Sequence, residues 1–128
     1  MMERNTRQRD AIRRVFEEIG RPLGPQEVLD AARDHVSGIG IATVYRTINA
    51  LVESKWLQIV ELPGAPPRYE RATDLHHHHF RCRACDRVFE IDGCPGNLAT
   101  MVPKGFSLEA HDVVLYGRCA TCASAIAA

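Results

Sequence analysis

The chain has 128 residues, of which 45% are hydrophobic and 25% charged, so an intrinsically disordered protein is excluded and one domain or two small ones are expected. Its formal net charge is zero, because 16 basic residues balance 16 acidic ones. A nucleic-acid-binding protein with a general basic excess is therefore excluded. Any DNA-binding surface must rely on a local cluster, such as the five arginines within residues 4–14, or its affinity must depend on a bound metal ion.

No apolar run approaches the roughly 18 residues that a membrane helix needs, and the first residues lead into no signal-peptide core. We therefore expect a cytoplasmic protein with no membrane partner. Because the cytosol keeps thiols reduced, the five cysteines argue against a disulfide framework.

Three helices are predicted in the first part of the chain. In residues 12–19 apolar side chains recur at i, i+3, i+4 and i+7, the spacing of one buried helical face, and Gly20 ends that helix. A second helix begins at Pro25, a residue favoured at the first helical position. A third spans residues 41–54 and buries one apolar face. Its other faces carry groups able to contact phosphates or base edges: Thr43, Tyr45, Arg46, Thr47 and Asn49.

Residues 56–62 and 68–72 read as two strands joined by a proline-rich turn, and three helices followed by a hairpin indicate a winged helix-turn-helix domain. The character of the sequence changes after residue 72. Strands are predicted at residues 76–81, 87–91 and 106–116, with a short helix through Met101. We expect an α+β fold, with a winged-helix DNA-binding domain and its hinge in residues 1–72 and a small α/β domain in residues 73–128.

Four cysteines form two C-x-x-C pairs, Cys82 with Cys85 and Cys119 with Cys122. Two intervening residues let a tight turn direct both sulfurs at one ion, and two such turns supply a tetrahedral set. A four-thiolate shell favours Zn²⁺ and leaves no open position for chemistry, so the predicted zinc is structural. A rubredoxin-like iron site and free thiols are the alternatives.

A run of four histidines, residues 76–79, precedes the first C-x-x-C pair. Side chains alternate between the two faces of an extended strand, so one strand is able to supply two ligands to each of two metal sites. A later histidine and the fifth cysteine complete the first candidate set, in which a thiolate and three imidazoles favour zinc over iron: His76, His78, Cys94 and His111. The nearest carboxylates complete the second set: Glu70, His77, His79 and Glu90.

Three motifs together resemble the ferric uptake regulator family of bacterial repressors: residues 42–46 (ATVYR), the histidine run before Cys82, and residues 115–119 (LYGRC). The resemblance covers nearly the whole chain. It implies a homodimer whose winged helices bind a palindromic operator and whose α/β domains dimerise and bind metal.

The resemblance also implies roles for single residues. Tyr45 and Arg46 match the recognition-helix contacts to DNA, whereas Thr6 and Arg9 lie where the first helix approaches phosphates. The four paired cysteines match the structural zinc site. The set with Glu70 and Glu90 matches the regulatory site near the hinge, and the set with His111 matches a further site in the dimerisation domain.

Two departures from the family pattern affect the metal sites. Pro22 stands where a histidine of the DNA-binding domain often joins the hinge site, and His35 is no obvious replacement. Cys94 stands where the further site normally has a carboxylate. The second exchange indicates a zinc-responsive member, so Zn²⁺ is the expected regulatory ion, with Fe²⁺ or Mn²⁺ as alternatives.

Other functions stay open at the level of the sequence. Within the family these are iron, manganese or peroxide sensing, with Cys94 as a redox thiol. Outside it, the chain could be a constitutive winged-helix and zinc-ribbon interaction module, which would bind one zinc ion. A zinc hydrolase needs an open metal position beside a general base, and no H-E-x-x-H pattern is present. We therefore expect no enzyme.

Overall fold

The computed structural model describes residues 2–74 and 76–127, and the chain divides into two compact units. Unit 1 is Met1–Thr73 and unit 2 is Asp74–Ala128. The division falls one residue after the end of the DNA-binding domain expected from the sequence.

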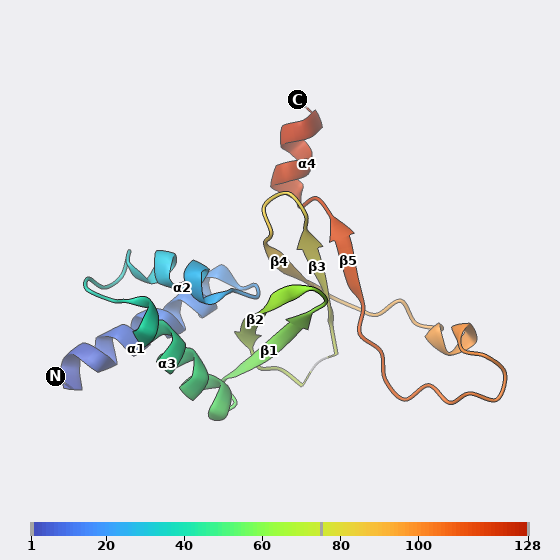
Figure 1. Ribbon diagram of the computed structural model, residues 1–128, viewed down its shortest axis with the longest axis horizontal. Helices are drawn as coiled ribbons and strands as arrows, with labels where there is room; N and C mark the ends of the chain where they lie inside the picture. The colour runs from blue at the N-terminus through green and yellow to red at the C-terminus, as the bar shows by residue number, and fades with distance from the viewer. Residues whose placement is uncertain (1, 75, 128) are drawn as a thin grey trace. The chain divides into compact units, whose positions relative to one another are not determined.

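Unit 1 consists of three helices and a two-stranded hairpin (Figure 1). The hairpin strands pair antiparallel, with Ile59 opposite Tyr69. Gly20 adopts the left-handed conformation (φ +68°) that ends the first helix, and glycine adopts it without the steric cost of a Cβ atom. The elements are α1 (Met2–Ile19), α2 (Pro25–Ala32), α3 (Ile41–Glu53), β1 (Leu57–Leu62) and β2 (Ala65–Arg71).

The apolar core of unit 1 joins all three helices to the start of β1. Its members are fully or almost fully buried, as helical amphipathicity predicts. Ile19, which the apolar spacing also predicts to be buried, is not part of this core: it lies in the last turn of α1 and is 39% exposed. The predicted apolar face therefore ends at Phe16. The buried cluster comprises Ile12, Val15, Phe16, Leu23, Val28, Leu29, Ala32, Ile39, Val44, Ile48, Leu51 and Leu57.

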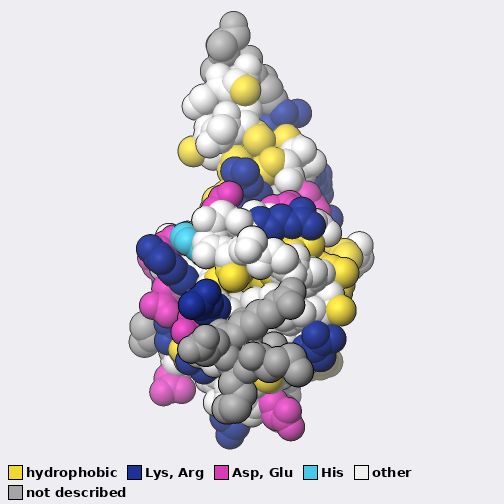
Figure 2. Space-filling model, turned by 90° about the vertical axis from the view of Figure 1, so that its left-hand side faces the viewer, with side chains coloured by type: hydrophobic (Ala, Val, Ile, Leu, Met, Phe, Trp, Pro, Cys, Tyr) yellow, Lys and Arg dark blue, Asp and Glu magenta, His cyan; other side chains and the backbone are white. Residues whose placement is uncertain are grey.

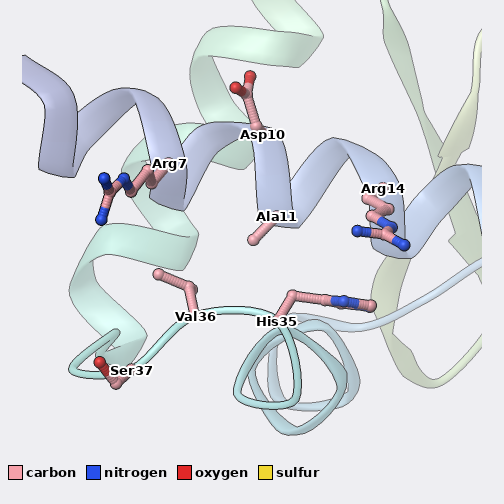
Figure 3. Close-up of a pocket in the computed structure, with 7 residues that line it drawn as sticks. All are labelled: Arg7, Asp10, Ala11, Arg14, His35, Val36 and Ser37. Atoms are coloured by element: carbon pink, nitrogen blue, oxygen red, sulfur yellow. The ribbon is translucent and has the colours of Figure 1, made fainter.

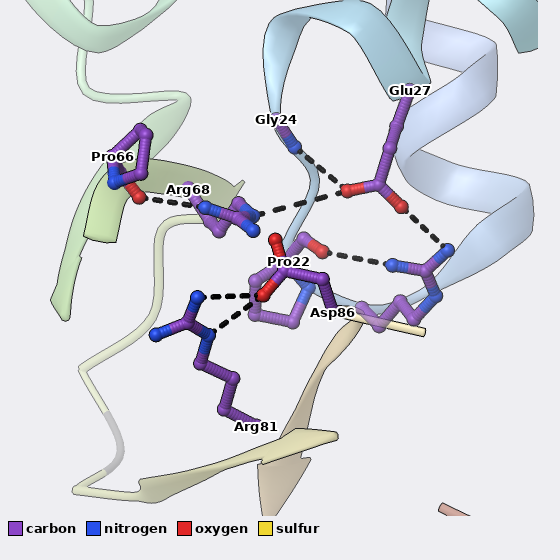
Figure 4. Close-up of polar contacts among 8 residues, drawn as sticks. Pro22, Gly24, Glu27, Pro66, Arg68, Arg81 and Asp86 are labelled. Atoms are coloured by element: carbon purple, nitrogen blue, oxygen red, sulfur yellow. Dashed lines mark hydrogen bonds and ion pairs between the residues drawn. The ribbon is translucent and has the colours of Figure 1, made fainter. Parts of the chain in front are cut away.

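A buried arginine ties the hairpin to the start of α2 (Figure 4). Arg68 Nη1 donates to the carbonyl oxygen of Pro66 at 2.7 Å, and Arg68 Nε lies 3.9 Å from Glu27 Oε1. Glu27 also accepts the backbone N–H of Gly24 at 3.1 Å and pairs with Arg21 at 2.9 Å. One carboxylate thus caps a helix and holds two arginines, which positions the hairpin relative to the helices.

Unit 2 contains a three-stranded sheet with β3 (His78–Cys82) in the centre (Figure 1). β3 pairs antiparallel with β4 (Val88–Ile91) and parallel with β5 (Val114–Gly117). A short 3₁₀ helix, η1 (Leu98–Met101), lies between β4 and β5, and α4 (Ala120–Ala127) follows β5.

One prediction for unit 2 is wrong in extent. The long strand expected over residues 106–116 is reduced to β5, because β3 pairs only with Val114–Gly117. The short helix expected through Met101 is present as the single 3₁₀ turn η1. His111 therefore precedes β5 instead of lying on a strand.

Unit 2 buries few side chains. Among its described residues the buried ones are His78, Cys82, Val88 and Cys119, and three of these four are predicted metal ligands. No helix in the described part of the chain has the length and apolar character needed to cross a membrane.

Candidate metal centres and nucleic-acid interface

The four paired cysteines converge from two places in unit 2. Cys82 ends β3 and Cys85 lies in the turn that follows it, whereas Cys119 directly precedes α4 and Cys122 lies in its first turn. The four Sγ atoms lie within 4.8 Å of one another. Cys85 Sγ and Cys119 Sγ are 3.8 Å apart. A tetrahedral zinc ion with Zn–S bonds of about 2.3 Å requires sulfur separations of about 3.8 Å, so the arrangement fits such an ion.

Backbone N–H groups prepare Cys82 to act as a thiolate. The amides of Cys85 and Cys119 donate to Cys82 Sγ at 3.4 and 3.3 Å. These bonds lower the pKa of the Cys82 thiol to about 6, the Cys85 amide having the larger effect. The Cys122 amide similarly lowers the pKa of the Cys119 thiol.

The close packing of the four sulfurs has the opposite effect on the pKa of Cys122. Hydrogen bonding with the Cys119 thiol, followed by that with Cys82, raises the pKa of Cys122 to about 12. Four sulfurs this close cannot all carry negative charge unless a cation lies among them. A divalent ion supplies that charge, so the donor chemistry agrees with the geometry.

A second group in unit 2 combines three imidazoles with the fifth cysteine. His76 Nε2 lies 3.0 Å from His78 Nε2 and 3.1 Å from His111 Nε2. Cys94 Sγ lies 2.9 Å from His111 Nε2, and all four ligand atoms are within 4.8 Å of one another. Tetrahedral zinc with Zn–N bonds of about 2.0–2.1 Å requires nitrogen separations of about 3.3 Å, close to those observed.

His78 is the buried member of this His–Cys centre, with 2% of its surface exposed. Its Nδ1 accepts the backbone N–H of Val113 at 3.0 Å, which fixes the orientation of the ring and, in the neutral form, leaves the proton on Nε2. Burial, and then the neighbouring His76, lower the pKa of His78. The ring is therefore neutral over a wider pH range than an exposed histidine, and a metal ligand must be neutral.

The two remaining histidines of the run lie together, as strand alternation predicts. The ring centroids of His77 and His79 are 5.0 Å apart. Glu90 stands opposite His79 in the β3–β4 register, and its Oε1 lies 3.2 Å from His77 Nε2. Unit 2 thus contributes two imidazoles and one carboxylate to this group.

Glu70, the other predicted carboxylate ligand, belongs to unit 1. It lies on β2 opposite Gln58, whose Nε2 donates to Glu70 Oε1 at 2.8 Å. It precedes the end of unit 1 at Thr73 by three residues. Of the four residues predicted for the hinge set, Glu70 belongs to unit 1 and the other three belong to unit 2.

The sequence profile described as the ferric uptake regulator family matches residues 2–116 of the chain. The chain belongs to the ferric uptake regulator family. Members of this family are transcriptional regulators that sense metals and bind DNA, and they are not enzymes.

Three relatives of this family member illustrate its range. The zinc uptake regulation protein of Mycobacterium tuberculosis is 32% identical over 126 residues, covering 94% of this chain and 95% of that protein. The ferric uptake regulation protein of Campylobacter jejuni is 36% identical over 87 residues, 66% of this chain and 55% of that protein. The Helicobacter pylori ferric uptake regulator, whose structure has three functional metal binding sites, matches with a TM-score of 0.68 and 28% identity, covering 91% and 79% of the two chains.

These likenesses confirm the predicted α+β fold, with a winged-helix domain followed by a dimerisation domain. They also confirm the predicted class of metal-responsive regulator. The relatives are named for both zinc and iron, so the family alone leaves the sensed ion open.

The predicted DNA-contacting residues of this family member lie on α1 and α3. Thr6 and Arg9 are exposed on α1. On α3, Tyr45 is 48% exposed, and Arg46 Nη2 donates to Thr43 Oγ1 at 3.1 Å. Thr47 is buried, so its predicted availability to DNA is wrong. Its spacing from Val44 and Leu51, three and four residues away, places it on the buried face of α3.

Unit 1 also has a pocket of about 400 Å³ that no sequence motif indicates, lined by α1 and the turn after α2 (Figure 3). Arg7 and Arg14 flank it on α1, and His35 and Ser37 line its other side. Arg14 and His35 both pair with Glu18, at 2.6 and 3.5 Å. Spacing alone signals that Arg7 and Arg14 share a helical face, but not that a turn packs beside it.

Basic and acidic side chains are interspersed on the face of the molecule drawn in Figure 2. On that face, neither sign of charge forms a separate field.

Proposed function

We propose that this protein is a cytoplasmic, zinc-responsive transcriptional repressor that binds palindromic operator DNA as a homodimer. The observation that carries the zinc assignment is the thiol of Cys94 beside three imidazole nitrogens. Its Sγ lies 2.9 Å from His111 Nε2, and the Nε2 atoms of His76 and His78 complete the group.

This donor set suits zinc because the ion accepts mixed nitrogen and sulfur ligands in a tetrahedral site. Ferrous and manganous ions accept more oxygen ligands and higher coordination numbers. A carboxylate at position 94 would remove that distinction. The similarity to the M. tuberculosis zinc uptake regulation protein along nearly the whole chain adds support.

We assign the four paired cysteines to a structural zinc ion. The hinge set then has a different role, because Glu70 belongs to unit 1 whereas His77, His79 and Glu90 belong to unit 2. Ligands from both units, bound to one ion, would favour one relative orientation of the units over the others. Pro22 contributes no ligand to this set, so the set has no counterpart of the histidine that often stands there.

The DNA-contacting surface in this proposal is the exposed part of α3. Tyr45 and Arg46 would read base edges, and Thr43, which already accepts a hydrogen bond from Arg46, would hold the guanidinium in position. Thr6 and Arg9 on α1 would contact phosphates. In a twofold-symmetric dimer, two such surfaces reach half-sites about one helical turn or a multiple of it apart.

Iron or manganese sensing is the second candidate, and the His77–Glu90 contact of 3.2 Å favours it. Imidazole and carboxylate ligands suit Fe²⁺ and Mn²⁺ as well as zinc. If the hinge set alone determined the response, the ion sensed would differ from the ion preferred by the His–Cys centre.

Operator binding at controlled free metal concentrations distinguishes the two. DNA fragments are selected from a random-sequence pool with the purified protein in zinc, and their affinity is measured in Zn²⁺, Fe²⁺ and Mn²⁺. We expect half-maximal binding at a free zinc concentration at least about 100-fold below that of the other two ions. Equal or tighter activation by iron or manganese would contradict the zinc assignment.

Two variants make this experiment sharper. The substitution Cys94→Glu replaces the thiol by a carboxylate. It should reduce the difference between the free zinc and free iron concentrations that give half-maximal binding to the same DNA. Tyr45→Ala should weaken binding in every metal, by about 1–3 kcal/mol for a lost base contact. Arg33→Ala, which removes an exposed arginine from the end of α2, is the matched control and should leave the affinity unchanged.

A further inference from the structure

We infer that Gln58 is the positioning residue of the hinge set: it orients the carboxylate of Glu70 and holds the backbone where the chain leaves unit 1. The inference rests on the proposed function, in which Glu70 is a ligand to a sensed ion. It adds to that function a residue that acts on the ligand through a hydrogen bond.

Gln58 and Glu70 are neighbours on the two strands of the hairpin. They stand opposite each other in the β1–β2 register, and the side chains of opposite residues in an antiparallel pair lie on the same face of the sheet. Gln58 Nε2 donates to Glu70 Oε1 at 2.8 Å. Glu70 is buried and Gln58 is half-buried, so water competes little with this hydrogen bond.

The other end of the same amide group reaches the last residue of unit 1. Gln58 Oε1 accepts the backbone N–H of Thr73, with a distance of 3.4 Å between nitrogen and oxygen. One residue earlier, the Ala72 N–H donates to the carbonyl oxygen of Trp56 at 3.0 Å. The Gln58 side chain thus continues the hydrogen bonding of the hairpin by one residue, to the point where unit 1 ends.

An amide side chain suits both partners. The Glu70 carboxylate needs a donor and the Thr73 N–H needs an acceptor, and glutamine supplies both from one planar group. A glutamate at position 58 would place a second negative charge beside Glu70. A methionine would fill a similar volume with neither a strong donor nor a strong acceptor.

One side chain therefore fixes two things together, the orientation of a ligand carboxylate and the path of the backbone that leads out of unit 1. Hydrogen-bond partners of metal ligands orient them, and removing such a partner typically lowers metal affinity by about 10- to 100-fold. Gln58 is expected to have this effect on an ion bound through Glu70.

Zinc binding to the hinge set of the full chain tests the inference. NMR signals of the His77 and His79 rings report the filling of this set at buffered free zinc concentrations. In Gln58→Met we expect half-saturation at a free zinc concentration about tenfold or more above that of the unmodified chain. Gln26→Met is the matched control, because Gln26 Nε2 donates to Asp30 Oδ1 at 3.0 Å on an exposed part of α2. It should leave half-saturation unchanged.

A double-mutant cycle separates positioning from a general effect on the fold. Glu70→Gln should itself weaken zinc binding to the hinge set. Adding Gln58→Met to Glu70→Gln should change half-saturation by about twofold or less, since the ligand on which Gln58 acts is gone. The backbone amide spectrum of unit 1 should indicate a folded unit in each variant. Gln58→Asn keeps the amide group on a shorter side chain and provides a second variant.

Unchanged zinc binding in both Gln58→Met and Gln58→Asn would overturn the inference, and so would an equally large effect of Gln58→Met in the Glu70→Gln background. An effect of Glu70→Gln without one of Gln58→Met would contradict the inference alone. If Glu70→Gln had no effect, Glu70 would not be a ligand, and the proposed role of the hinge set would fail together with the inference.

Discussion

The two units of this chain are stabilised in different ways. Unit 1 has a conventional apolar core in which side chains from α1, α2, α3 and β1 are almost fully buried. Unit 2 has no comparable core, since its described buried residues are Val88 and three candidate ligands, His78, Cys82 and Cys119. Within a single chain, the comparison indicates that metal ligation takes the place of hydrophobic burial in the smaller unit, which is one of the ways in which domains of fewer than about 70–80 residues are stabilised.

This difference suits a metal-responsive regulator. A DNA-binding unit that folds without metal keeps its recognition helix formed whether or not metal is bound. Metal then changes how that helix is positioned for DNA and leaves the fold of the unit unchanged. A unit whose structure depends on ligation changes when metal is lost. The structural ion and the sensed ions must then differ in affinity, because otherwise the sensor would unfold whenever it responded.

The largest expected effect comes from removing a structural ligand. Cys119→Ser takes a buried thiolate from the four-cysteine centre, and zinc binding to such centres contributes on the order of 10–16 kcal/mol to folding. We expect the variant to lose its tightly bound zinc and the dispersed amide resonances of unit 2, while those of unit 1 remain. If the variant kept one zinc ion and an unchanged spectrum of unit 2, the conclusion that metal ligation stabilises this unit would be contradicted.

A large-to-small substitution in the core of unit 1 should give the next largest effect. Ile48 is fully buried, and Ile48→Ala should lower the free energy of unfolding of unit 1 by about 2–5 kcal/mol through lost burial and cavity formation. Zinc content should not change. Ile41→Ala on the same helix, where 39% of the side chain is exposed, should cost about 0.5 kcal/mol or less in denaturant unfolding.

The buried arginine of the hairpin should have a smaller but measurable effect. Arg68→Ala removes the bond to the Pro66 carbonyl and leaves Glu27 with one arginine fewer, so a loss of about 1–3 kcal/mol is expected. The exposed Arg33–Asp30 pair provides the control, since Arg33→Ala should cost about 0.5 kcal/mol or less. Equal melting temperatures of the two variants would show that the hairpin does not depend on Arg68.

The smallest expected effect concerns pH. The hydrogen bond from Arg14 lowers the pKa of Glu18, so its contribution is present above the ordinary carboxyl pKa and is lost as the pH falls through the lowered value. In Arg14→Gln the pKa of Glu18 should rise towards its ordinary value in an NMR titration. Arg7 lies on the same face of α1, and the control substitution Arg7→Gln should leave the titration of Glu18 unchanged.

Much of the fold followed from local patterns. Helical periodicity located α1 to α3, and the change of character near residue 72 preceded the observed division by one residue. Strand alternation predicted that His76 lies beside His78 and His77 beside His79, and the side-chain rings of each pair are in contact. Side-chain period and turn chemistry depend on neighbouring residues, so a sequence expresses them directly.

Features set by distant partners were less accessible. β5 is short because β3 limits its pairing, and no pattern within residues 106–116 reveals the length of its partner. The ion pair of Arg68 with Glu27 joins residues far apart in the chain. Thr47 is different, since its periodicity indicated burial and its polarity suggested exposure. For Ile19 the prediction was wrong in the opposite sense. Its apolar spacing indicated burial, but a residue in the last turn of a helix can lack a neighbouring surface that covers it.

Hydrogen–deuterium exchange of the unmodified chain, with and without a strong chelator that removes every metal ion, tests the contrast between the units most directly. We predict that exchange in β3, β4 and β5 rises to nearly unfolded rates in the chelator, while the amides of α3 and β1 keep their protection. Loss of protection in both units together, or unchanged protection in the sheet of unit 2, would contradict the conclusion that metal ligation replaces a core there.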